Sequence, residues 1–98
     1  MSDLLSELQS KRAAIRELGE RYGARRIRVF GSVVHGEEGP ESDVDFLVDF
    51  PRGYDLFGQR LPLTQELAEL LHRPVDVVPE HELNPYIRER VLREAIDL

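Results

Sequence analysis

Residues 26–49, RIRVFGSVVHGEEGPESDVDFLVD, decide the fold of this chain. Residues 26–30 alternate arginine with apolar side chains and stop at a glycine-serine pair, which predicts a strand with an abrupt end. Glycine and proline in residues 36–42 predict a polar loop. Residues 43–49 alternate acidic and apolar side chains almost without exception, so they predict a second strand with one acidic and one buried face.

The segments on either side of this stretch complete an α/β pattern. Apolar residues at helical spacing predict a helix over residues 3–22 and another that ends near Leu71. Residues 74–78 predict a third strand, and Asn84 followed by Pro85 is typical of the start of a last helix. The fold class that follows is α/β (α+β): a small mixed β-sheet of about three strands with helices packed on it.

Length and composition narrow the functions that the chain can have. With 98 residues, we expect one domain over residues 1–98. Its 13 basic and 19 acidic residues give a net charge of −6, which argues against extended nucleic acid as the main partner. A small nucleotide is not excluded, because a metal ion can neutralise its charge. Cysteine is absent, which excludes disulfides and thiolate metal sites.

The start of the chain lacks the basic stretch and apolar core of a signal peptide. No apolar run approaches the roughly 20 residues that span a bilayer, so no membrane association is expected. The expected location is the cytoplasm.

Two carboxylates in the second strand are the main candidates for chemistry. Asp43 and Asp45 are two residues apart, so a strand turns both to the same face. Like charges placed so close repel each other unless a cation lies between them, and hard oxygen ligands suit Mg²⁺. Asp76, set between two valines of the third strand, is the best candidate for a third ligand. Two Mg²⁺ ions about 3.5–4 Å apart would stabilise both oxygens of an in-line phosphoryl displacement.

The glycine-serine pair after the first strand is suited to phosphate. Gly31 allows backbone N–H groups to approach an anion closely. A helical turn that begins at Ser32 would direct N–H groups and the serine hydroxyl toward phosphate oxygens. A phosphate-binding turn beside metal-binding carboxylates predicts transfer of a nucleotidyl group from a nucleoside triphosphate.

Gly31-Ser32, followed after ten residues by Asp43-x-Asp45, resembles the signature of the DNA polymerase β-like nucleotidyltransferase superfamily. The short chain resembles its minimal nucleotidyltransferase (MNT) branch in particular. Further segments share the likeness, namely residues 54–58, 74–78 and 83–96. The resemblance therefore extends over most of residues 25–97.

The resemblance implies a role for each of these residues and a partner. It implies that Gly31 and Ser32 bind the triphosphate, and that Asp43, Asp45 and Asp76 act in catalysis by holding two Mg²⁺ ions. Proteins of this kind are commonly antitoxins of helical HEPN ribonucleases. The implied activity is a protein adenylyltransferase that moves AMP from ATP to a tyrosine hydroxyl of the HEPN partner and silences it.

The segment after the glycine-serine pair departs from the family pattern. The family often has arginines there, where this chain has Val33, Val34 and His35. Arg28 and Arg52 are candidates to bind phosphate in place of those arginines. The arginines of the last helix are interpreted, with the glutamates around them, as a solvated face or a partner contact: Arg88, Arg90 and Arg93.

Other functions stay open at this point. The absence of arginines after Ser32 favours a catalytically weak module that neutralises a toxin by binding it. Transfer to a small molecule is a third hypothesis. A small chain with several apolar helix faces can also form a homo-oligomer.

Overall fold

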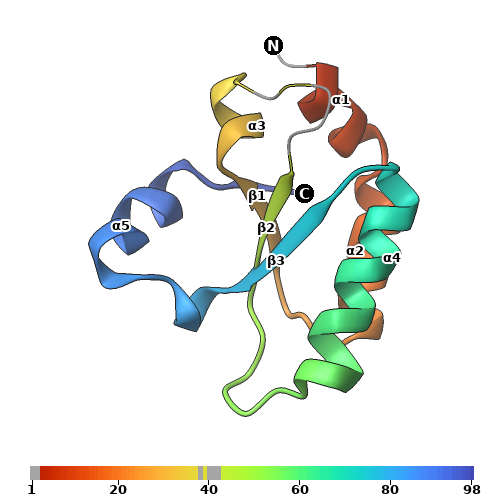
Figure 1. The fold of residues 1–98 in the computed structure, drawn as a ribbon, viewed down its shortest axis with the longest axis vertical. Helices are drawn as coiled ribbons and strands as arrows, with labels where there is room; N and C mark the ends of the chain where they lie inside the picture. Colours follow the sequence, from red (N-terminus) through yellow and green to blue (C-terminus); the bar gives the residue numbers. More distant parts are fainter. Residues whose placement is uncertain (1–2, 38, 40–42) are drawn as a thin grey trace.

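The computed structural model describes residues 3–37, 39 and 43–98, which form a sheet with helices on both faces (Figure 1). The helices are α1 (Asp3–Ser10), α2 (Arg12–Arg21), α3 (Ser32–His35), α4 (Leu61–Leu71) and α5 (Pro85–Glu94). The strands are β1 (Ile27–Phe30), β2 (Val44–Val48), β3 (Val75–Pro79) and β4 (Ile96–Asp97). Two short turns, η1 (Leu56–Arg60) and η2 (Glu80–Glu82), precede α4 and α5. None of the described helices is long and apolar enough to cross a membrane.

The sheet is mixed, and its strand order is β3-β2-β1-β4. β1 is antiparallel to both β2 and β4, whereas β2 and β3 are parallel and are connected through α4, as parallel neighbours require a crossover. The predicted mixed α/β sheet is confirmed, with one strand more than expected. Ala95 leaves the helical conformation (φ −63°, ψ 141°), so Ile96 pairs with Val29 instead of extending the last helix.

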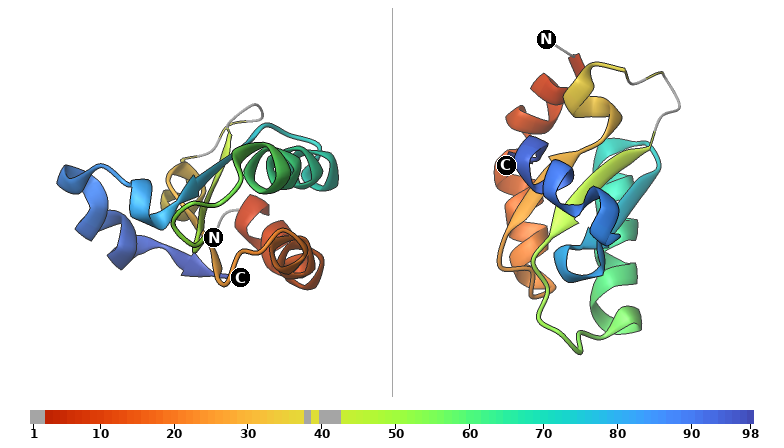
Figure 2. Two further views of the ribbon diagram at one scale, coloured as in Figure 1. Left: turned by 90° about the horizontal axis from the view of Figure 1, so that it is seen from below. Right: turned by 90° about the vertical axis from the view of Figure 1, so that its left-hand side faces the viewer.

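The larger core lies between the sheet and α1, α2 and α4, which cover one face together (Figure 2). Alternate residues of each strand point into it, as period-two alternation predicts. The strand residues buried there are Ile27, Val29, Val44, Phe46, Val48 and Val77. From the helices, Leu8, Ile15, Leu63 and Leu67 are fully enclosed.

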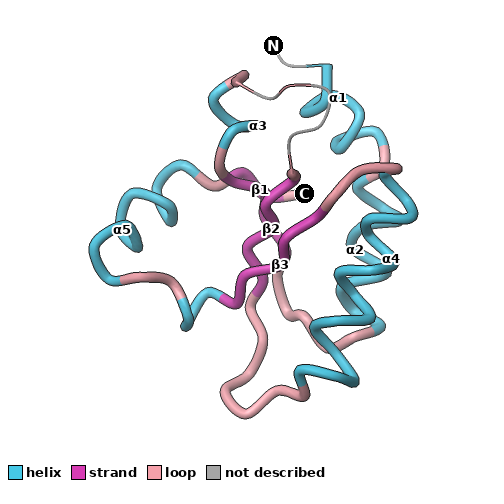
Figure 3. The backbone as a smooth tube through the Cα atoms, viewed as in Figure 1, coloured by secondary structure: helices cyan, strands magenta, loops and turns pink. Residues whose placement is uncertain are grey.

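The opposite face is covered only in part. Leu47 packs there against Leu83 and Val91, and Phe30 adds a partly buried ring. The end of β1 and the helix α3 lie at one end of the sheet, and the loop between β2 and α4 lies at the other end (Figure 3). At the end of the sheet beside α3, Asp43 and Asp76 are exposed.

The N-terminal helix is divided, although the sequence predicts one helix over residues 3–22. The hydroxyl of Ser10 donates to the carbonyl oxygen of Glu7 at 2.7 Å, and α1 ends there. A serine hydroxyl that bonds to its own backbone competes with helical hydrogen bonding. The ammonium group of Lys11 then donates to the carbonyl oxygen of Leu70 at 3.3 Å, which ties the break to α4.

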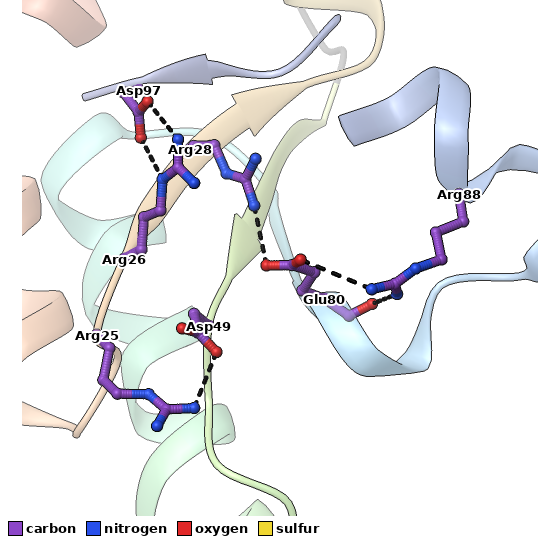
Figure 4. A network of polar contacts seen from close by, with 7 residues as sticks. All are labelled: Arg25, Arg26, Arg28, Asp49, Glu80, Arg88 and Asp97. Carbon is purple, nitrogen blue, oxygen red and sulfur yellow. Dashed lines mark hydrogen bonds and ion pairs between the residues drawn. The ribbon is translucent and has the colours of Figure 1, made fainter. Parts of the chain in front are cut away.

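A buried arginine connects the sheet to α5 (Figure 4). Arg28 lies opposite Leu47 on the α5 face, and its side chain is 8% exposed. Its Nη2 donates to Glu80 Oε2 at 2.9 Å, while Arg88 of α5 donates to the Glu80 carbonyl oxygen at 2.7 Å. Nearer the surface, Arg26 makes two bonds to Asp97 and holds β4 on β1. Glu80 is thus the link between β1 and α5.

Replacing Glu80 tests this link. In Glu80→Gln the buried guanidinium of Arg28 loses its charged partner, so we expect the free energy of unfolding to fall by about 2 kcal/mol. Asp97→Asn is the matched control, because it breaks an exposed arginine pair and should cost about 1 kcal/mol or less. Urea denaturation measures both. Equal losses in the two variants would show that the buried pair has no special role.

Candidate active site

The structure brings Asp43, Asp45 and Asp76 to one end of the sheet. Asp45 lies directly opposite Asp76 in the parallel pair of β2 and β3, and opposite Phe30 in the antiparallel pair of β1 and β2. Directly paired residues point to the same face, and Asp43 joins them because it is two residues from Asp45. This face is the one that α5 leaves open.

The electrostatics of Asp45 reflect this arrangement. Burial raises the pKa of the Asp45 carboxyl, and the charges of Asp76 and Asp43 raise that pKa further. None of the three carboxylates forms an ion pair with any residue that the structure describes. A partly buried cluster of negative charge without a basic neighbour is unfavourable unless a cation joins it.

The donor set fits Mg²⁺ in its chemistry. All three side chains offer carboxylate oxygens, which Mg²⁺ prefers, and Asp43 and Asp76 are exposed, so a metal keeps access to water and substrate. Within the described residues, however, no group of three His, Cys, Asp or Glu side chains is gathered closely enough to hold a metal ion. The metal site therefore stays a prediction, supported by the shared face and the mutual repulsion.

Gly31 connects this cluster to the turn after β1. Its backbone has φ 81° and ψ −146°, a conformation that is essentially restricted to glycine. A Cβ at this position would also overlap the Asp45 carboxylate. The carboxylate of Asp45 thus lies against the backbone of Gly31, immediately before Ser32 begins α3.

The two glycines that flank α3 offer a matched test. In Gly31→Ala, the backbone strain and the clash with Asp45 act together, so we expect a loss of roughly 3 kcal/mol or more in the free energy of unfolding. Gly36 also has positive φ (70°), but nothing lies within 4 Å of an added Cβ. Gly36→Ala should therefore cost only about 1–2 kcal/mol. If urea denaturation gives the same loss for both variants, Asp45 does not press on Gly31.

A pocket of about 400 Å³ is lined by residues of α3 and α5 and by Gly31, which also lies against Asp45. The end of β1 and α3 contribute Phe30, Gly31, Ser32, His35 and Glu37, and α5 contributes Ile87, Arg90, Val91 and Glu94. His35 Nε2 and Glu94 Oε2 are 3.0 Å apart, so they join the two helices directly. The pocket is of the size that small ligands occupy.

Of the three residues after Ser32, His35 lines the pocket, whereas Val33 and Val34 belong to the core. Val33 is buried in the larger core, and Val34 packs against it. Neither of the suggested replacement arginines lies at the pocket. Arg28 is paired with Glu80, and Arg52 lines a separate pocket at the far end of β2.

The arginine that does line the pocket is Arg90, for which the sequence predicted a solvated face or a partner contact. The pattern that could have identified it is the spacing of Ile87, Arg90, Val91 and Glu94, because residues three, four and seven apart share one side of a helix. Only the packing of α5 on the sheet shows that this side faces Ser32.

Comparison with known proteins agrees with this geometry. Residues 11–98 match the family model described as nucleotidyltransferase domain, and the chain belongs to this family. It is 43% identical over 93 residues to the protein adenylyltransferase MntA of Thermococcus cleftensis, with 94% of this chain and 93% of that protein covered. The predicted resemblance and the assignment as a nucleotidyltransferase enzyme are both confirmed.

Solved structures show the same relationship. A minimal nucleotidyltransferase aligns with a TM-score of 0.83 and 46% identity, covering 100% of this chain and 97% of that chain. A toxin–antitoxin structure with AMP-PNP aligns with a TM-score of 0.73 and 25% identity, covering 87% of this chain and 69% of that chain. The fold of this chain is thus the nucleotidyltransferase fold.

The raised pKa of Asp45 gives a pH-dependent prediction. Because the folded state favours the protonated carboxyl, ionisation of Asp45 removes stability as the pH rises through this pKa. In EDTA at pH 7.5, Asp45→Asn should therefore melt about 2–4 °C above the wild type, and the difference should vanish well below the pKa of an ordinary aspartate. Mg²⁺ should stabilise the wild type and the control variant, but not Asp45→Asn. Calorimetry checks this, with Glu89→Gln on the exposed side of α5 as the control. A variant that melts below the wild type in EDTA would contradict the repulsion.

Proposed function

We propose that this chain is an antitoxin that transfers AMP from ATP to a tyrosine hydroxyl of a HEPN-family toxin in the cytoplasm. The observation that carries the proposal is the pairing of Asp45 with Asp76 directly beside Gly31. Two comparisons support it. One relative is named protein adenylyltransferase MntA, and one neighbour is a toxin–antitoxin structure with AMP-PNP.

In this proposal, different residues of the chain bind the phosphates and the metal ions. Gly31 offers a backbone that has no Cβ to obstruct an approaching phosphate, and Ser32 offers its hydroxyl. Asp43, Asp45 and Asp76 would hold two Mg²⁺ ions. When bound, Mg²⁺ neutralises phosphate charge and makes a hydroxyl at the site more acidic.

The transfer itself is an in-line substitution at phosphorus. The tyrosine oxygen forms a bond to the α-phosphorus, the bond from that phosphorus to the β-phosphate oxygen breaks, and pyrophosphate leaves with the electron pair. Asp43 or Asp76, both exposed on the open face, takes up the proton of the hydroxyl. Because these carboxylates face solvent, the acceptor can be presented by another protein.

The decisive experiment incubates the chain with the product of the adjacent gene, ATP and Mg²⁺, and measures intact masses. We expect the partner to gain whole AMP units and Asp43→Asn to abolish the gain. Asp49→Asn is the matched control, since Asp49 belongs to the same face but lies beyond the far end of β2 and pairs with Arg25 at 3.1 Å.

Other outcomes would replace the proposal. An unchanged mass together with a tight complex would identify a binding module that neutralises the toxin without chemistry. Modification of a small hydroxyl compound, with the partner unchanged, would identify a small-molecule transferase.

A further inference from the structure

The pocket between α3 and α5 adjoins the carboxylate cluster at Gly31. This residue lines the pocket, and the Asp45 carboxylate lies against its backbone. A ligand whose reacting atom is at the carboxylates can therefore extend past Gly31 into the pocket. In the proposed reaction that atom is the α-phosphorus, so the pocket receives either the pyrophosphate portion of the nucleotide or its nucleoside.

Two groups of the pocket lining, the Ser32 hydroxyl and the Arg90 guanidinium, suit the pyrophosphate portion, while Glu37 adds a carboxylate to the same lining. His35 Nε2 and Glu94 Oε2 are 3.0 Å apart, so these two side chains of the pocket lining are engaged with each other. Ser32 stands on the α3 side, and its hydroxyl has no hydrogen bond to a described residue. Arg90 stands on the α5 side at the exposed edge, and no described residue forms a hydrogen bond or an ion pair with it. A hydroxyl and a guanidinium that are both without a partner among the described residues thus line the same pocket.

The other arginines of α5 do not share this position. Arg88 is engaged with Glu80 on the side of the helix toward η2. Arg93 is exposed and does not line the pocket. Arg90 is therefore the α5 cation that a ligand held at Gly31 and Ser32 can reach.

We propose that Arg90 binds the β- and γ-phosphates of the nucleoside triphosphate and stabilises the pyrophosphate as it leaves. The inference rests on the proposed function and adds a specific phosphate-binding residue to it. A guanidinium suits this role, because its planar N–H groups can make two parallel, charge-assisted hydrogen bonds to phosphate oxygens. The triphosphate is thereby held from two sides, by the turn after β1 and by α5.

The test is calorimetric titration of ATP, AMP and inorganic pyrophosphate, each with Mg²⁺, into the wild type and three variants. Arg90→Ala should weaken ATP and pyrophosphate binding about 10- to 100-fold, which is the range for hydrogen bonds to charged groups, and should leave AMP binding within about threefold. Arg90→Lys keeps the positive charge but loses the paired N–H donors of the guanidinium, so its affinity for ATP and pyrophosphate should lie between those of the wild type and Arg90→Ala. Arg93→Ala is the matched control and should bind all three ligands like the wild type.

The outcomes separate this inference from the function on which it rests. If the Arg90 variants melt at the same temperature as Arg93→Ala, they are folded. If the wild type binds ATP and modifies its partner, but Arg90→Ala binds ATP as Arg93→Ala does, the role of Arg90 is wrong and the function stands. An equal loss of ATP and AMP would also overturn it, because the contact would then be to the nucleoside. If the wild type binds no triphosphate, both fail.

Discussion

The repulsion among three carboxylates at one end of the sheet is the constraint on which the rest of the site depends. Asp45 and Asp76 are held side by side by the strand register, and the backbone hydrogen bonds of the sheet prevent them from separating. The Asp45 carboxylate also lies against Gly31, so the turn after β1 depends on a residue without a Cβ at this position. A fold that keeps like charges together in this way is prepared for a cation and a polyanionic substrate.

The second half of the site comes from α5, nearly at the other end of the chain. Two contacts place this helix: the Glu80 link to Arg28 below, and the pair of His35 with Glu94 above. The apolar cluster of Leu47, Leu83 and Val91 packs the same helix against the sheet. The side of α5 that carries Ile87 and Glu94 faces α3 across the pocket.

Much of this arrangement could be predicted from local patterns. The alternation in residues 43–49 assigned the acidic face of β2, and the two valines around Asp76 assigned the strand that carries it. Both patterns depend only on the period of a strand. The shared face of the candidate residues also followed, once the two strands were taken as neighbours.

The features that escaped prediction depend on tertiary packing. The burial of Arg28 contradicts its polar position in an alternating strand, and only the distant Glu80 explains it. The short β4 exists because β1 offers it an edge. Arg90 belongs to an ordinary charged helix until the sheet positions that helix. The metal ions and the extent of the domain stay predictions.

The central claim is that the three carboxylates bind the metal that holds the nucleotide. Crystals grown with AMP-PNP and Mn²⁺ in place of Mg²⁺ test it most directly, because anomalous scattering locates Mn²⁺ independently of the protein atoms. We expect anomalous peaks among the carboxylates of Asp43, Asp45 and Asp76, next to the triphosphate. Peaks elsewhere, or a nucleotide bound with Asp76 turned away from the metal, would contradict the claim.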